Sequence, residues 1–196
     1  MQRVVLGLAV AAVGVAGIAN VGPTNANGAS AQASTVEAFQ YQGQPIHPKL
    51  VEEFEGSLAD AGPCPTVVVD VAAAFGTNEY AEAVETTATG LVKYESPAGW
   101  YGYVHLGTLE DGTHVLRTAS NGGGSGVFTN LMFVHVDPPR SATSPTGSEF
   151  RRVLMHHLGS FPLGDRDDGA VSVEADRVVV GPSRYRALST TLRPGR

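Results

Sequence analysis

The chain opens with a long apolar stretch and then changes to short apolar runs separated by polar residues. From Val4 to Val21 there is no charged residue, and Arg3 supplies the charge that precedes this stretch. A polar segment of small residues follows and ends on Ala31-Gln32-Ala33. This order is typical of a secretory signal peptide, so we expect residues 1–33 to be removed on export. Because the apolar run approaches the ~20 residues of a membrane-spanning helix, an uncleaved anchor is the alternative.

Beyond residue 33, the apolar pattern predicts mainly β structure with one or two short helices. The helix with the best periodicity is expected at 48–58, where Pro48 suits the first helical turn. Its apolar residues recur at the spacing of one helical face: Leu50, Val51, Phe54 and Leu58. The Ala-rich segment 72–80 is compatible with either a second short helix or a loop. We therefore expect a mainly β fold, an antiparallel sandwich or a partly open barrel.

The strongest strand pattern lies between residues 100 and 136. Asp111-Gly112 predicts a hairpin turn there, and the nearly apolar run 127–136 predicts a central strand that is buried on both faces. Three consecutive antiparallel strands should result. Further strands are expected within 35–42, 66–71, 86–94, 150–158, 170–174, 177–181 and 184–188. The polar, proline-containing stretch 137–149 should be a connection, and it is our candidate boundary between two lobes of a single domain over residues 34–196.

Charge and cysteine content narrow the classes of partner. The whole chain carries a formal charge of −6, and removal of residues 1–33 leaves 12 basic and 19 acidic residues. A moderately acidic domain is a poor match for nucleic acid or an anionic membrane surface, since both favour clustered Lys and Arg. We expect no nucleic-acid partner and no stable membrane insertion after signal removal. Cys64 is the single cysteine, so no disulfide can form within the chain.

The Gly-rich segment 122–126 resembles a functional loop but fails the spacing tests. It lacks the Lys of a phosphate-binding loop, and Val127 stands where a nucleophile elbow needs glycine. The favoured interpretation is a tight connection between two strands, in which glycine permits positive φ. The alternative is that its amide groups, together with Asn121 and Ser125, form a concave contact for an anion or a sugar.

The six histidines raise the question of a metal site. His105 and His114 should share a face of the predicted hairpin, about 13 Å apart with a two-residue turn and roughly 7 Å apart with a four-residue loop. His156 and His157 are adjacent and should point to opposite faces of a strand. No spacing typical of a zinc protein occurs, and the acidic turn 165–169 departs from the spacing of a calcium loop. We therefore expect no bound metal and no cofactor, with weak calcium binding as an open alternative.

Two functional hypotheses follow for this exported domain. The first is a non-enzymatic protein of the cell envelope or the extracellular space that binds a glycan, a protein or a small ligand. Its candidate binding residues are Tyr101, Tyr103, His105, Asn121 and Ser125, because the first three share one strand face that would suit stacking if it were exposed. The second is a small secreted hydrolase whose site would lie near His105, His114 and Ser125.

Overall fold

The computed structural model describes residues 39–59, 67–77, 80 and 82–194, which belong to a single β-rich domain. Most of the described structure is β, with two short helices, as the sequence pattern predicted. The signal-peptide prediction and Cys64 lie outside the described residues. Neither described helix has the length and apolar content needed to cross a membrane.

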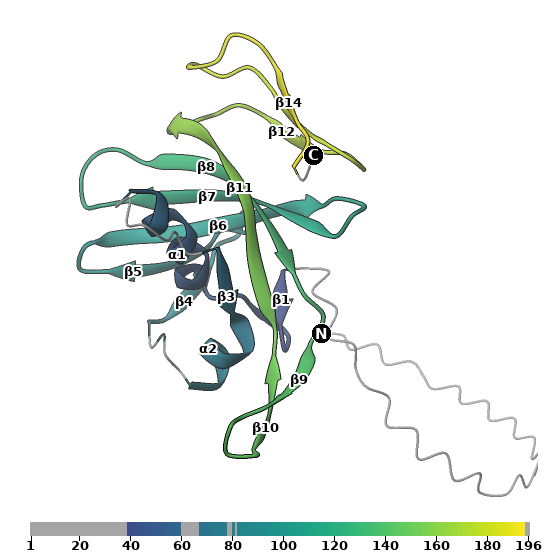
Figure 1. The fold of residues 1–196 in the computed structure, drawn as a ribbon. Helices are drawn as coiled ribbons and strands as arrows, with labels where there is room; N and C mark the ends of the chain where they lie inside the picture. Colours follow the sequence, from purple (N-terminus) through teal and green to yellow (C-terminus); the bar gives the residue numbers. More distant parts are fainter. Residues whose placement is uncertain (1–38, 60–66, 78–79, 81, 195–196) are drawn as a thin grey trace, which may run out of the picture. The chain divides into compact units, whose positions relative to one another are not determined.

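Seven antiparallel strands form a curled half-barrel sheet (Figure 1). In spatial order they are β3 (Val68–Asp70), β11 (Leu154–Asp165), β8 (Phe128–Val136), β7 (Thr113–Asn121), β6 (Gly99–Thr108), β5 (Val92–Ser96) and β4 (Val84–Thr86). Strands β6, β7 and β8 are the predicted meander, and β8 lies between β7 and β11 in the interior of the sheet. Strand β3 falls within the predicted strand segment 66–71 and lies at the sheet edge, where Val68 is 40% exposed.

The turn between β6 and β7 is a three-residue loop rather than the two-residue or four-residue form considered from the sequence. The amide of Leu109 donates to the carbonyl of Thr113 at 2.8 Å, so Glu110, Asp111 and Gly112 form the loop. Gly112 has φ +83°, which glycine adopts without strain. The Asp111 carboxylate also accepts from the Thr113 amide at 2.9 Å, and this bond closes the turn.

Each helix begins directly after a residue whose side chain accepts hydrogen bonds from free backbone amides of the first turn. Helix α1 (Pro48–Ala59) follows His47, whose Nδ1 accepts from the Lys49 amide at 3.1 Å. Helix α2 (Val71–Thr77) follows Asp70, whose Oδ1 accepts from the amides of Ala72 and Ala73 at 3.1 and 3.2 Å. Such caps satisfy amides that have no partner within the helix and so fix its starting point.

The sheet has apolar side chains packed on both faces. On one face, α1 inserts Leu50, Val51 and Phe54 against side chains of β5 to β8 and β11. A hairpin of β1 (Gln40–Tyr41) and β2 (Gln44–Pro45) joins the same core through Tyr41. On the other face, Val178 packs with residues of β7, β8 and β11. The three-stranded sheet β12 (Val171–Val173), β13 (Val178–Val180) and β14 (Thr190–Leu192) therefore covers part of this second face.

Two expectations for the remaining segments are corrected by the structure. The stretch 137–149 is not a simple loop, because it contains β9 (Arg140–Thr143) and leads into β10 (Glu149–Arg152), and these two strands pair with each other. The last strand does not lie within 184–188. That segment begins in a turn closed by a bridge between Ser183 and Arg186, and the final strand is β14.

Candidate functional site

A cavity of about 550 Å³ lies beside the start of α1. Its walls come from the β1–β2 hairpin, α1, α2 and the segment that enters β4. The lining residues are mostly apolar: Tyr41, Gln44, Pro45, Ile46, His47, Leu50, Val71, Ala74, Phe75, Tyr80, Glu82, Val84 and Thr86. A volume of this size is typical of sites that hold small organic molecules.

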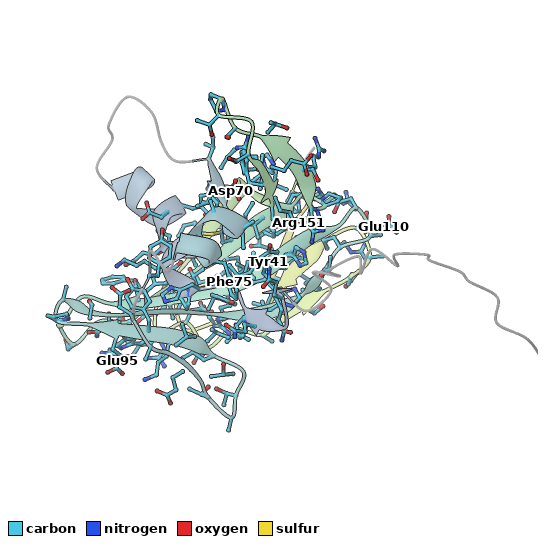
Figure 2. The ribbon with its side chains drawn as sticks, turned by 90° about the horizontal axis from the view of Figure 1, so that it is seen from below. Tyr41, Asp70, Phe75, Glu95, Glu110 and Arg151 are labelled. Carbon is cyan, nitrogen blue, oxygen red and sulfur yellow. The ribbon has the colours of Figure 1, made fainter. Side chains whose placement is uncertain are left out.

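The cavity has a buried apolar wall and a partly exposed apolar rim. Tyr41, Ile46 and Leu50 are at most 4% exposed, so they form the inner wall. Phe75 and Val84 are 41% and 38% exposed, so they lie at the rim. The rings of Tyr41 and Phe75 meet edge to face with centroids 5.3 Å apart, and Figure 2 shows these two residues next to each other. The hairpin and α2 therefore contact each other through aromatic side chains of the cavity lining.

His47 is the lining residue whose chemistry most resembles that of a catalytic group. Its Nδ1 accepts from the Lys49 amide, so its Nε2 carries the ring hydrogen and donates to the carbonyl of Glu82 at 3.3 Å. Burial lowers the pKa of His47, which favours this neutral form. The ring stacks on Tyr80 at 5.2 Å. Because both ring nitrogens are engaged by backbone groups, His47 supports the structure of the cavity and is not poised as a general base.

The charges beside the cavity are paired. Lys49 Nζ lies 2.7 Å from a carboxylate oxygen of Glu82. The hydrogen bond from Lys49 lowers the pKa of the Glu82 carboxyl, so the pair is ionised at neutral pH. The Lys49 ammonium also lies over the rings of Tyr80 and Tyr94, 5.5 and 5.9 Å from their centroids. With Glu82 paired and His47 neutral, the described lining residues offer no uncompensated charge to a ligand.

We expect the protein to lose stability as the pH falls from 7 to 5, in part because of His47. Its pKa is below 6.5 in the folded chain and near 6.5 in the unfolded chain, so the unfolded state binds more protons as acid is added. His47→Asn keeps a capping acceptor and removes the titration. Urea midpoints at pH 7 and pH 5 should therefore differ less for the variant than for the unchanged protein. Equal differences would contradict this account.

The structure places Tyr101 and Tyr103 in the core, so they cannot form the exposed stacking surface considered from the sequence. Each is 1% exposed. The Tyr103 hydroxyl donates to the Ile46 carbonyl at 2.6 Å, and burial raises the pKa of the Tyr101 hydroxyl, which lies beside Glu55 and Thr118. Their strand face is covered by α1 and the segment that precedes it. Both residues therefore serve packing.

The predicted hydrolase residues do not come together. His105 and His114 meet near the β6–β7 turn, with 3.3 Å between His105 Nε2 and His114 Nδ1. Ser125 follows the opposite end of β7, and the seven residue steps from His114 to Asn121 span roughly 23 Å of strand. Ser125 is exposed on its loop. A site that combines Ser125 with the two histidines is therefore not formed.

Asn121 is used to close the Gly-rich loop. Its side-chain amide donates to the carbonyls of Gly124 and Gly126 at 2.9 and 2.6 Å, and its side-chain oxygen accepts from the Gly123 amide at 2.8 Å. These three bonds hold the segment 122–126 in a tight connection between β7 and β8. This arrangement supports the structural interpretation of 122–126 over the anion or sugar contact.

Two polar groupings were missed by sequence reasoning. On α1, Glu52 accepts from the Tyr94 hydroxyl, and Glu55 accepts from Thr118 Oγ1 at 2.5 Å and Asn130 Nδ2 at 3.2 Å. These bonds attach the helix to the sheet. The glutamates follow the helical spacing of i and i+3, but their partners lie on strands far along the chain, so no local pattern indicates them.

The second grouping surrounds Asp137. His156 Nε2 lies 3.4 Å from one carboxylate oxygen, and His135 Nε2 lies 3.9 Å from the other. His157 lies on the opposite face and stacks on Phe54, as the alternation of strand side chains predicted. Within the described part of the chain, no three His, Cys, Asp or Glu residues are arranged to hold a metal ion.

Comparisons of this chain with protein-family models, with curated proteins and with solved structures find no match.

Proposed function

We propose that this protein is a non-enzymatic binding protein that works outside the cytoplasm and holds a small, neutral, mainly apolar ligand in the cavity beside α1. The observation that carries the proposal is a cavity of about 550 Å³ whose described lining residues are mostly apolar and whose acidic lining residue, Glu82, is paired with Lys49. Polar groups at the rim, such as Gln44 and Thr86, would orient the ligand. The signal-like N-terminal sequence supports a location outside the cytoplasm.

Charge balance favours a neutral ligand over an ionic one. An anion in the cavity would lie near Glu82, and a cation would have to compete with Lys49 for the same carboxylate. Transfer of an ion from water into an apolar site is costly unless the site provides a partner. An uncharged apolar molecule has no such cost. Its transfer from water contributes about 25 cal/mol of favourable free energy per Å² of buried apolar surface.

Binding is favoured over catalysis because of the state of His47. A general base needs a ring nitrogen that is free to take a proton, whereas both nitrogens of His47 bond to backbone groups. The Glu82 carboxylate is likewise engaged, because it accepts a hydrogen bond from Lys49. His47 and Glu82 therefore stabilise the wall of the cavity.

We expect the neutral fluorescent probe N-phenyl-1-naphthylamine to bind the protein and Ala74→Phe to weaken that binding about tenfold or more. Ala74 is 7% exposed and lines the cavity, so a larger side chain there occupies ligand space. Ala73→Phe is the matched control, because Ala73 is exposed on the same helix and lies outside the lining. Fluorescence titration measures both. Equal affinities for the two variants, or no binding by the unchanged protein, would contradict the proposal.

A further inference from the structure

Three potential metal ligands meet on the sheet face that carries α1, away from the cavity lining. They are His105 near the end of β6, Thr108 as the last residue of β6, and His114 on β7. His105 Nε2 and His114 Nδ1 are 3.3 Å apart, while Thr108 Oγ1 lies 3.1 Å from His114 Nδ1 and 3.4 Å from His105 Nε2. These three atoms form a nearly equilateral triangle.

We propose that this triangle binds one divalent first-row transition metal ion, Cu²⁺ or Zn²⁺, through the two imidazole nitrogens and the threonine oxygen. In a tetrahedral site with bonds of 2.0–2.1 Å, ligand atoms lie about 3.3–3.4 Å apart. The three observed separations, at which the side chains hydrogen-bond to one another, are close to that value, so an ion above the triangle would reach all three atoms and replace these bonds. Water would complete the coordination, and imidazole ligands suit both ions.

A β-bulge is the reason that the two histidines meet. Thr108 pairs with His114 and Gly107 with Val115, but the next pair joins His105 to Leu116, so one extra residue is inserted in β6. With regular pairing, His105 would face Arg117, which points to the opposite side of β7 from His114. Bulges commonly reorient a side chain in this way. The local irregularity thus places His105 on the face of His114.

The orientation of both rings suits metal binding. His105 Nε2 and His114 Nδ1 both face Thr108 Oγ1, and a neutral imidazole offers a lone pair to a metal ion.

Packing holds the rings in place, and Thr108 lies on the exposed side of the triangle. Phe39 stacks on His105 with centroids 5.8 Å apart and tilts against His114 at 5.4 Å. His114 is only 5% exposed, whereas Thr108 is exposed. An ion would therefore enter on the side of the Thr108 hydroxyl.

The grouping of His135 and His156 around Asp137 is an alternative metal site, and the experiment must distinguish binding there from binding at the triangle. Arg140 Nη2 lies 3.8 Å from the Asp137 carboxylate, so a positive charge already occupies the neighbourhood that a metal ion would need. The double variant His135→Ala/His156→Ala removes both histidines of that grouping and leaves the triangle intact.

Calorimetric titration of untagged, chelator-treated protein with Cu²⁺, and separately with Zn²⁺, tests the proposal. We expect one equivalent to bind, with an affinity at least tenfold lower in His105→Ala and in His114→Ala, a smaller loss in Thr108→Val, and no change in the double variant. Electron paramagnetic resonance of the Cu²⁺ protein should show two coordinated imidazoles, and one in His105→Ala. Circular dichroism checks that each variant is folded.

Three results would overturn the proposal. They are no binding of either ion, unchanged affinity in both single variants, or loss of binding in the double variant alone. The electron paramagnetic resonance spectrum of the Cu²⁺-loaded, unsubstituted protein is an independent test that does not depend on whether a variant folds. Fewer than two coordinated imidazoles in that spectrum would exclude this site.

Discussion

Replacement of Asp167 by alanine should lower the free energy of unfolding by about 3–5 kcal/mol. The Asp167 side chain is fully buried between two guanidinium groups, with Arg117 Nη2 at 3.2 Å and Arg186 Nη2 at 3.4 Å. It also accepts from the Gly169 amide at 3.0 Å. Removal of the carboxylate leaves two largely buried cations without their anion, and this is far more costly than the loss of an exposed ion pair.

Urea denaturation and thermal unfolding measure this effect, and the neighbouring residue is the control. For a domain of this size, a loss of 3–5 kcal/mol lowers the melting temperature by roughly 10 °C. Asp168 pairs with Arg184 at 3.6 Å, but both side chains are more than half exposed. Asp168→Ala should therefore leave the midpoint nearly unchanged. If the two variants unfold at the same urea concentration, the buried network does not have the structural role that we assign to it.

This network illustrates what the sequence could not provide. The acidic segment 165–169 predicts a charged turn, and the Gly169 amide bonded to Asp167 fits that prediction. Arg117, however, lies fifty residues earlier on β7. The contact depends on how the strands are arranged, so no local pattern distinguishes the buried Asp167 from the exposed Asp168.

Elements with strong local patterns were predicted well. The helix at 48–58 has an apolar face and a proline in its first turn, and α1 spans Pro48–Ala59. The three strands of the meander are long, rich in aromatic and β-branched residues, and bounded by glycine. The last strand was misplaced because 184–188 and 190–192 are both short, and only pairing with β13 selects the second.

The candidate sites depend on contacts that a single sequence does not reveal. The cavity joins Tyr41, Phe75 and Val84, which come from three separate elements. The face on which His105 lies depends on a single bulged residue of β6, because the side-chain period of a strand is two. The regular hairpins considered from the sequence place His105 and His114 on one face but about 13 or roughly 7 Å apart. The observed loop and bulge bring the two ring nitrogens to 3.3 Å. Tyr101 and Tyr103 are buried because α1 covers their face of the sheet.

Phe54→Ala is the second substitution for which we expect a large effect, with a loss of about 3–5 kcal/mol in the free energy of unfolding. Phe54 is completely buried and stacks on His157 with centroids 5.3 Å apart and planes at 14°. It packs with Leu50 and Val51 of α1 against the sheet. Alanine would leave a cavity at the centre of the contact between helix and sheet, and surrounding side chains fill such a space only in part.

The same substitution at an exposed phenylalanine is the control. Phe128 is 62% exposed, so Phe128→Ala should change the urea midpoint only slightly, since surface substitutions usually alter stability by less than about 0.5 kcal/mol. Because Leu50 contributes to both the helix core and the cavity wall, Phe54→Ala should also weaken N-phenyl-1-naphthylamine binding. A folded Phe54→Ala protein with unchanged stability would show that α1 is not anchored to the sheet through this ring. Retention of full probe affinity despite the lost stability would instead show that the cavity wall is held by the β1–β2 hairpin and α2 alone.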